Sequence, residues 1–144
     1  LSIYEKQLCV KTHLYPQAEE VLVALHHAGY RMAVCTNKVD RLSVTLIEQL
    51  GIAPLFSAIC GRDHFPFCKP DPRHLVETIQ VAGGNPHNAI MIGDSITDLQ
   101  TARAAGLPSI GVTFGYTTTP MIELKPDRLI DHFRDLPGAI ESLK

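Results

Sequence analysis

The feature that most constrains the fold of this chain is the alternation of short apolar runs with segments of helical periodicity. Apolar runs of strand length are found at residues 31–36, 57–60, 89–92, 108–112 and 128–130. Apolar side chains recur at helical spacing in residues 18–28, 42–50, 75–82, 99–105 and 136–143. Strands that alternate with helices predict a parallel sheet with right-handed crossovers. We therefore expect an α/β fold with three layers, in which helices cover both faces of a Rossmann-like parallel sheet.

Size and charge narrow the class of protein. The 144 residues fit one domain, and hydrophobic residues make up 45% of them. The net charge is -2 without a basic block, so we expect neither nucleic acid nor a membrane surface as a partner. No apolar run approaches the roughly 18 residues that span a bilayer. The four cysteines form no Cys-x-x-Cys pair, which is typical of reduced thiols in a cytoplasmic protein.

Ligands of parallel α/β folds bind beyond the carboxyl ends of the strands. Thr36 and Asn37 directly follow the first expected strand. A hydroxyl followed by backbone N–H groups in a loop that enters a helix suits a phosphate oxygen. A Thr/Asn turn or a helix cap would explain the same two residues without any ligand.

Two carboxylates follow a later strand. Asp94 ends the apolar run Ile90–Gly93, and Asp98 lies four residues further on, in the first turn of the next expected helix. This spacing lets both carboxylates face one point above the edge of the sheet. Mg²⁺ prefers hard oxygen ligands and commonly takes one or two carboxylates together with substrate phosphate and waters. An acidic residue in the first turn is also stabilising on its own.

A lysine lies between these two motifs. Lys69 precedes Pro70-Asp71-Pro72, and the two prolines restrict the backbone around it. An ammonium group held in this way can neutralise a phosphate or keep a carboxylate ionised. The simpler interpretation is a solvated lysine beside the start of a helix, with Asp71 as the cap.

The order of these motifs resembles the haloacid dehalogenase (HAD) superfamily of phosphohydrolases, and within it the phosphoglycolate phosphatases. The resemblance covers nearly all residues from Tyr15 onward and includes Tyr15-Pro16, residues 102–106 and residues 111–116. It implies a Mg²⁺-dependent phosphatase that hydrolyses a small phosphorylated metabolite through an aspartyl-phosphate intermediate.

The resemblance also implies a role for each motif residue. Thr36 would hydrogen-bond the transferring phosphoryl group, with Asn37 beside it, and Lys69 would stabilise the nucleophile and the phosphoryl charge. Asp94 would bind magnesium. Asp98 would bind magnesium as well, or orient Lys69 and the waters on the metal. Arg62, which stands where relatives often have a small residue, could contact a substrate carboxylate, although a solvated loop arginine is the simpler interpretation.

The motif that defines this superfamily, Asp-x-Asp-x-Thr at the end of the first strand, is absent from the chain. No two aspartates are separated by one residue. We therefore expect residues 1–14 to be the tail of a helical cap with its return linker, and residues 15–144 to be the C-terminal part of the phosphatase core. The sheet would then lack the family's first, central strand. Either a segment outside this sequence supplies that strand, or the chain repacks, for example as a homodimer.

Without the nucleophilic aspartate the chain should be inactive and should bind metal weakly or not at all. Three alternatives stay open. The chain could be a fragment that binds only phosphate or a partner protein, or it could derive from a sugar phosphatase or from a phosphomutase. A signalling receiver domain is disfavoured because its acidic pair precedes its lysine. A dinucleotide-binding module is disfavoured because no Gly-x-Gly-x-x-Gly follows a strand.

Overall fold

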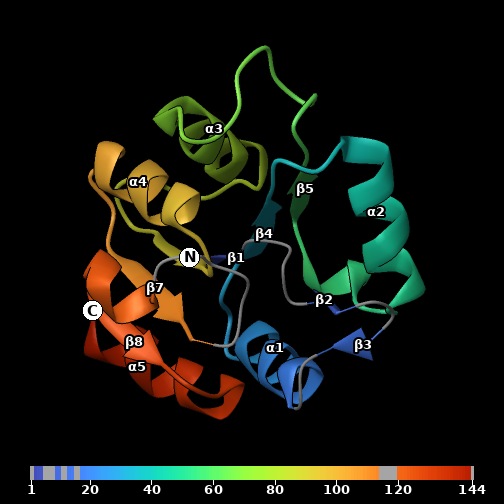
Figure 1. Ribbon diagram of the computed structural model, residues 1–144. Coiled ribbons are helices and arrows are strands. Elements are labelled where there is room, and N and C mark those ends of the chain that lie inside the picture. Colours follow the sequence, from blue (N-terminus) through green and yellow to red (C-terminus); the bar gives the residue numbers. More distant parts are fainter. Residues whose placement is uncertain (1, 5–8, 11–12, 15–16, 114–119, 144) are drawn as a thin grey trace.

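The sheet at the centre of the molecule is parallel and has six strands. The computed structural model describes residues 2–4, 9–10, 13–14, 17–113 and 120–143. The strand order is β5-β4-β1-β6-β7-β8 (Figure 1). The bounds are Ser2–Tyr4 for β1, Met32–Cys35 for β4, Ala58–Cys60 for β5, Ile90–Gly93 for β6, Ser109–Val112 for β7 and Arg128–Ile130 for β8. Two short strands, β2 (Cys9–Val10) and β3 (His13–Leu14), pair with each other in an antiparallel manner outside this sheet.

Helices cover both faces of the sheet. Their bounds are Ala18–His27 for α1, Asp40–Gln49 for α2, Pro72–Val81 for α3, Ile96–Ala104 for α4 and Leu136–Ser142 for α5. Successive residues of β4 point to opposite faces. Met32 and Val34 belong to the core under α1, α2 and α5, whereas Ala33 and Cys35 belong to the core under α3 and α4. The expected three-layer α/β fold with a parallel sheet is thereby confirmed.

The middle of the sheet differs from the expectation, because its central position is not vacant. Ser2–Tyr4 form β1 and pair with β4 on one side and β6 on the other. The inner edges of β4 and β6 would otherwise carry buried N–H and C=O groups without ladder partners, and a parallel strand between them satisfies both. The assignment of residues 1–14 to a cap tail and linker stays a prediction for the remainder of that segment.

Three helices begin earlier than their apolar periodicity predicts. α3 begins at Pro72 because the Asp71 side chain accepts a hydrogen bond from the Arg73 N–H, and α4 begins at Ile96 because Ser95 caps it through the Asp98 N–H. α2 begins at Asp40, an acidic residue of its first turn. The first turns of these three helices contain polar residues, so the spacing of apolar residues does not reveal where the helices begin. Tyr15, Pro16 and residues 114–116, which contribute to the resemblance, lie outside the described residues.

None of the described helices combines the length and the hydropathy needed to cross a membrane. The expected homodimer is not tested by a single chain and stays a prediction.

A proline at the centre of β1 tests whether this strand belongs to the sheet. Ile3 is the register partner of Ala33 and of Met91, so Ile3→Pro removes an N–H donor between two parallel neighbours. We expect the free energy of unfolding, measured by urea titration, to fall by about 1–3 kcal/mol, since a buried acceptor loses its donor. Ile3→Val keeps the backbone donor and serves as the control. A proline variant as stable as the valine variant would show that β1 does not stabilise the sheet.

Candidate active site

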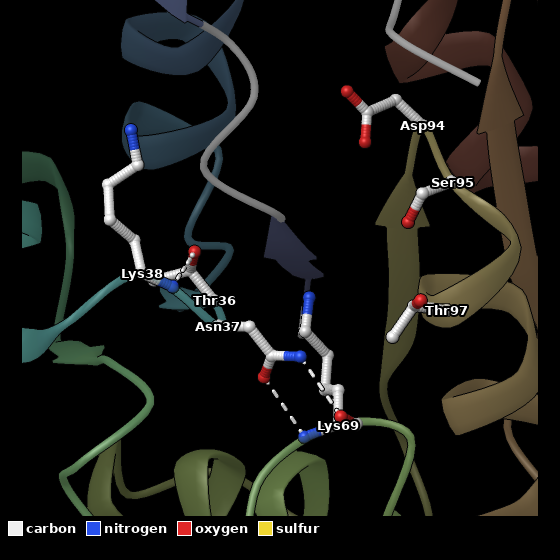
Figure 2. A pocket seen from close by; sticks show the side chains of 7 residues that line it. All are labelled: Thr36, Asn37, Lys38, Lys69, Asp94, Ser95 and Thr97. Atoms are coloured by element: carbon white, nitrogen blue, oxygen red, sulfur yellow. Dashed lines mark hydrogen bonds between the residues drawn. The ribbon is translucent and has the colours of Figure 1, made fainter. Parts of the chain in front are cut away.

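A pocket opens at the carboxyl edge of the sheet, where β4 and β6 end. Its volume is about 330 Å³. Figure 2 shows the side chains that line it, which come from the loop after β4, the loop before α3, the loop after β6 and the first turn of α4: Thr36, Asn37, Lys38, Lys69, Asp94, Ser95 and Thr97. Three residues predicted from the sequence, Thr36, Lys69 and Asp94, therefore meet in one cavity with Asn37 at its wall. Asp98 lies directly behind it.

Thr36 is held so that its hydroxyl proton stays available. Its backbone N–H donates to the Cys60 carbonyl at 3.1 Å, which continues the pairing of β4 with β5. Its side-chain oxygen accepts a hydrogen bond from the Lys38 N–H at 3.1 Å. Because that bond uses a lone pair of the oxygen, the O–H can still donate to a ligand in the pocket. Thr36 is 2% exposed, so its position is fixed by packing as well.

Asn37 clamps the loop that carries the lysine. Its Nδ2 donates to the Lys69 carbonyl at 2.9 Å, and its Oδ1 accepts a hydrogen bond from the Lys69 N–H at 3.1 Å. The two bonds fix the backbone of Lys69 relative to the end of β4. The structure thus gives Asn37 a positioning contact, and its contact with substrate stays a prediction.

The Lys69 side chain is buried and paired. Its Nζ donates to Asp98 Oδ1 at 2.5 Å and to the Cys35 carbonyl at 3.1 Å (Figure 2 shows its course from the loop). The side-chain exposed fractions of Lys69 and Asp98 are 2% and 0%. Burial lowers the pKa of the Lys69 ammonium, and the neighbouring Asp98 carboxylate opposes that shift.

Asp98 joins the lysine to the end of β6. Its Oδ1 accepts from Lys69, and its Oδ2 accepts from the Asp94 N–H at 3.0 Å. A Cβ on Gly93 would overlap the Asp98 side chain, so only glycine fits before Asp94. Both Asp98 oxygens already accept hydrogen bonds. The arrangement therefore favours a role for Asp98 in orienting Lys69, and magnesium ligation by Asp98 stays a prediction.

Asp94 is the one carboxylate of the site whose oxygens are unsatisfied. Asp94 is 2% exposed, and neither of its carboxylate oxygens has a hydrogen-bond partner in the described part of the chain. Burial raises the pKa of Asp94 to about 7, and the nearby Asp98 carboxylate adds to the shift. A buried carboxylate in this state is well suited to a cation that enters the pocket.

The residues present fit magnesium better than a metal that needs a full protein cage. Among the described residues, no group of three or more His, Cys, Asp or Glu side chains could hold a metal ion. Mg²⁺ is commonly bound through one or two carboxylates while substrate phosphate and waters complete its shell. Asp94 supplies such a carboxylate next to the Thr36 hydroxyl and the Lys69 ammonium.

Sequence reasoning missed three residues that line the pocket, namely Lys38, Ser95 and Thr97. Lys38 directly follows the Thr36-Asn37 pair, and Ser95 and Thr97 lie between the two predicted carboxylates. The position of these three residues next to the predicted motif residues was the sequence feature that could have indicated them as pocket residues. Ser95 also accepts the Asp98 N–H at 3.3 Å, which places Asp98 at the start of α4.

Comparison with known proteins gives one family and a consistent set of relatives. Residues 1–112 match the family described as haloacid dehalogenase-like hydrolase. The chain is 50% identical to a phosphoglycolate phosphatase of Agrobacterium fabrum over 137 residues, which cover 95% of this chain and 59% of that protein. It is 48% identical to a phosphoglycolate phosphatase of Mesorhizobium japonicum over 133 residues, 92% of this chain and 59% of the relative.

Solved structures agree with this similarity. The crystal structure of a predicted phosphoglycolate phosphatase from Haemophilus somnus superposes with a TM-score of 0.85 at 34% identity, over 92% of this chain and 59% of that one. A putative beta-phosphoglucomutase from Thermotoga maritima shares the fold, with a TM-score of 0.77 at 17% identity. The chain spans about 60% of the length of the curated relatives compared with it, among them the two above.

Removing the buried ammonium should destabilise the fold through Asp98. Lys69→Met leaves the Asp98 carboxylate buried without its cation, which costs about 3–5 kcal/mol in comparable ion pairs. The double variant Lys69→Met/Asp98→Asn removes that charge and should unfold at a higher urea concentration than Lys69→Met alone. Lys38→Met, at an exposed position, is the control and should stay within about 0.5 kcal/mol of the parent chain. A double variant no more stable than Lys69→Met would argue against a charge-based effect.

Neutralising Asp94 should stabilise the chain in the absence of divalent cations. Because the pKa of Asp94 is raised to about 7 in the folded state, its ionisation destabilises the fold as the pH rises from about 4 to 7. Asp94→Asn should therefore unfold at a higher urea concentration than the parent at pH 8. Its free energy of unfolding should exceed that of the parent by about 1.4 kcal/mol for each unit of pKa shift. The difference should vanish near pH 4.

Asp71 provides the control, because its pKa is shifted in the opposite direction to that of Asp94. Hydrogen bonds from Arg73 lower the pKa of Asp71, so its ionised form stabilises the fold above pH 4. Asp71→Asn should not gain stability between pH 4 and pH 8. The same gain in both variants would point to net charge and not to the burial of Asp94.

Proposed function

The chain belongs to the haloacid dehalogenase-like hydrolases, and we propose that it is the core part of a Mg²⁺-dependent phosphomonoester hydrolase, a phosphoglycolate phosphatase in its full-length form. The proposed reaction converts 2-phosphoglycolate and water to glycolate and phosphate in the cytoplasm. One observation carries the proposal: the Thr36 hydroxyl, the Lys69 ammonium and the unsatisfied Asp94 carboxylate face one pocket. The names of the relatives support the choice of substrate.

Each side chain of the pocket has a task in this reaction. The Thr36 O–H donates to a phosphoryl oxygen, and Lys69 neutralises charge that develops on the phosphoryl group. Asp98 keeps Lys69 charged and aimed at the pocket, and Asn37 fixes the backbone of the same lysine. Mg²⁺, held by Asp94 together with substrate and waters, supplies Lewis-acid stabilisation of the phosphoryl oxygens when it is bound.

The covalent step needs a residue that this sequence does not contain. The family forms an aspartyl phosphate on the first aspartate of Asp-x-Asp-x-Thr, and no such pair occurs in the 144 residues. Phosphate monoesters hydrolyse extremely slowly without catalysis, so binding and charge neutralisation alone give little turnover. We therefore propose that the chain by itself is inactive and binds Mg²⁺ weakly, with Asp94 as its principal protein ligand.

Three other functions are compatible with the same pocket. A fragment that binds phosphate or a partner protein without turnover would use Thr36 and Lys69 in the same way. A sugar phosphatase or a phosphomutase would share the core and differ in the cap, which in this family largely determines the substrate. The assay below distinguishes them by their substrates.

A phosphatase assay on two lengths of the protein tests the proposal. The 144-residue chain, verified by an intact mass near 15.8 kDa, should show no turnover of an aryl phosphate with Mg²⁺. A version extended at its N-terminus to the length of the relatives should hydrolyse 2-phosphoglycolate in preference to sugar phosphates and should lose activity on chelation of the metal. Thr36→Val in the extended form should lower kcat/KM by about tenfold or more, the effect of losing a hydrogen bond to a charged group.

Comparable turnover by both lengths would contradict the requirement for the missing aspartate. An extended protein that binds phosphate without turnover would support the binding function. An extended protein that prefers sugar phosphates would reassign the substrate and keep the reaction class.

A further inference from the structure

We propose that Lys38 forms a subsite for a second anionic group of the substrate, a carboxylate, at the rim of the pocket that receives the phosphate. The inference rests on the proposed function and deepens it, because it names the residue that would recognise the carboxylate of a substrate such as 2-phosphoglycolate. It is carried by the fixed backbone of Lys38, its place in the pocket and the difference between its surroundings and those of Lys69.

The backbone of Lys38 is held at both of its polar atoms. Its N–H donates to the Thr36 side-chain oxygen at 3.1 Å, and its carbonyl accepts from the Arg62 N–H at 2.8 Å. A further, longer hydrogen bond of 3.4 Å reaches the same carbonyl from the Ser43 hydroxyl. The Lys38 side chain therefore leaves the backbone at a point fixed relative to the Thr36 hydroxyl, to which the phosphate is proposed to bind.

The Lys38 side chain runs along the wall of the pocket. It lines the same cavity as Thr36 and Asp94, and its residue is exposed. Figure 2 shows the stem of Lys38 extending past Thr36, with its ammonium group well apart from that of Lys69. Two lysines thus line the pocket: Lys69 is buried, whereas Lys38 is exposed and its ammonium group lies on the side of Thr36 away from Asp94.

The two lysines differ in what already neutralises them. The Lys69 ammonium is buried against the Asp98 carboxylate. Within the part of the chain that the structure describes, Lys38 makes no ion pair, and its residue is exposed. A phosphate at Thr36 and Lys69 would leave this second cation free for another anionic group of the same molecule. Electrostatic complementarity of this kind discriminates between ligands more than it adds affinity.

Arg62 was the candidate that the sequence suggested for a substrate carboxylate. The structure places it on the neighbouring loop, where its backbone N–H supports the Lys38 carbonyl, and it is not among the residues that line the pocket. The exposed Arg62 thus provides a matched control: a cation of the same charge, next to Lys38 in space, outside the cavity.

A binding experiment on the 144-residue chain separates the two anionic groups. The probes are methylphosphonate, which carries only the phosphoryl-like group, and phosphonoacetate, which adds a carboxylate. Both are titrated at low salt into the parent chain, Lys38→Gln, Lys38→Arg and Arg62→Gln, and binding is followed by calorimetry or by NMR shifts. We expect the parent to bind phosphonoacetate more tightly than methylphosphonate.

Lys38→Gln should weaken phosphonoacetate binding by about tenfold, the effect of losing one charge-assisted hydrogen bond, and should leave methylphosphonate within about threefold of the parent. Lys38→Arg should retain the preference, and Arg62→Gln should match the parent. Urea unfolding of each variant confirms that the fold is unchanged.

Equal weakening of both probes by Lys38→Gln would overturn the inference, because Lys38 would then serve the phosphate. Loss of the preference in Arg62→Gln, or no change in Lys38→Gln, would overturn it as well. Methylphosphonate binding that is independent of Lys38, without any carboxylate preference, would overturn the inference and leave the proposed function standing. A parent chain that binds neither probe would contradict the inference, and the assay on the extended protein would still decide the proposed function.

Discussion

The buried pair of Lys69 and Asp98 is the interaction on which the site depends. It joins four segments: the loop before α3, the carbonyl at the end of β4, the backbone after β6 and the first turn of α4. Transferring two charges out of water is expensive, and replacing such pairs by apolar side chains is often neutral or stabilising. The position of this pair at the edge of a pocket is therefore better explained by a role in the chemistry of the site than by a contribution to the stability of the fold. It keeps a cation beside Thr36 and orders the backbone that presents Asp94.

The same pair explains why Asp94 is left unsatisfied. Asp98 directs one oxygen to Lys69 and the other to the Asp94 N–H, and neither group reaches the Asp94 carboxylate. Burial therefore raises the pKa of this carboxylate to about 7 in the folded chain, and a bound cation would favour its ionised form. A ligand that binds only the folded state stabilises it in proportion to its concentration. Cation binding and folding are linked through this one side chain.

The sequence predicted the residues that follow strands, and it missed those whose role arises from contacts across the chain. Thr36, Lys69, Asp94 and Asp98 could be placed at one edge because the carboxyl ends of parallel strands meet there. The clamp between Asn37 and Lys69 could not, since no local pattern relates two residues that are 32 positions apart. The place of Lys38 in the cavity was missed although Lys38 directly follows Asn37, because adjacency alone does not say which side chains of a loop line a pocket. β1 was missed because three residues are too short a run to show the periodicity of a strand.

The position of β1 has a consequence for synthesis on the ribosome. During translation β1 is made before both of its partners, and β6, which begins at Ile90, follows long after β4, which ends at Cys35. At roughly 5–20 residues per second, the growing chain spends several seconds with the inner edge of β4, and any β1 already paired to it, open on one side. An open edge of this kind is a template for another strand. Until β6 arrives, the nascent chain is most exposed to pairing with a neighbouring copy, and a chaperone or a slow start of folding would protect it during that interval.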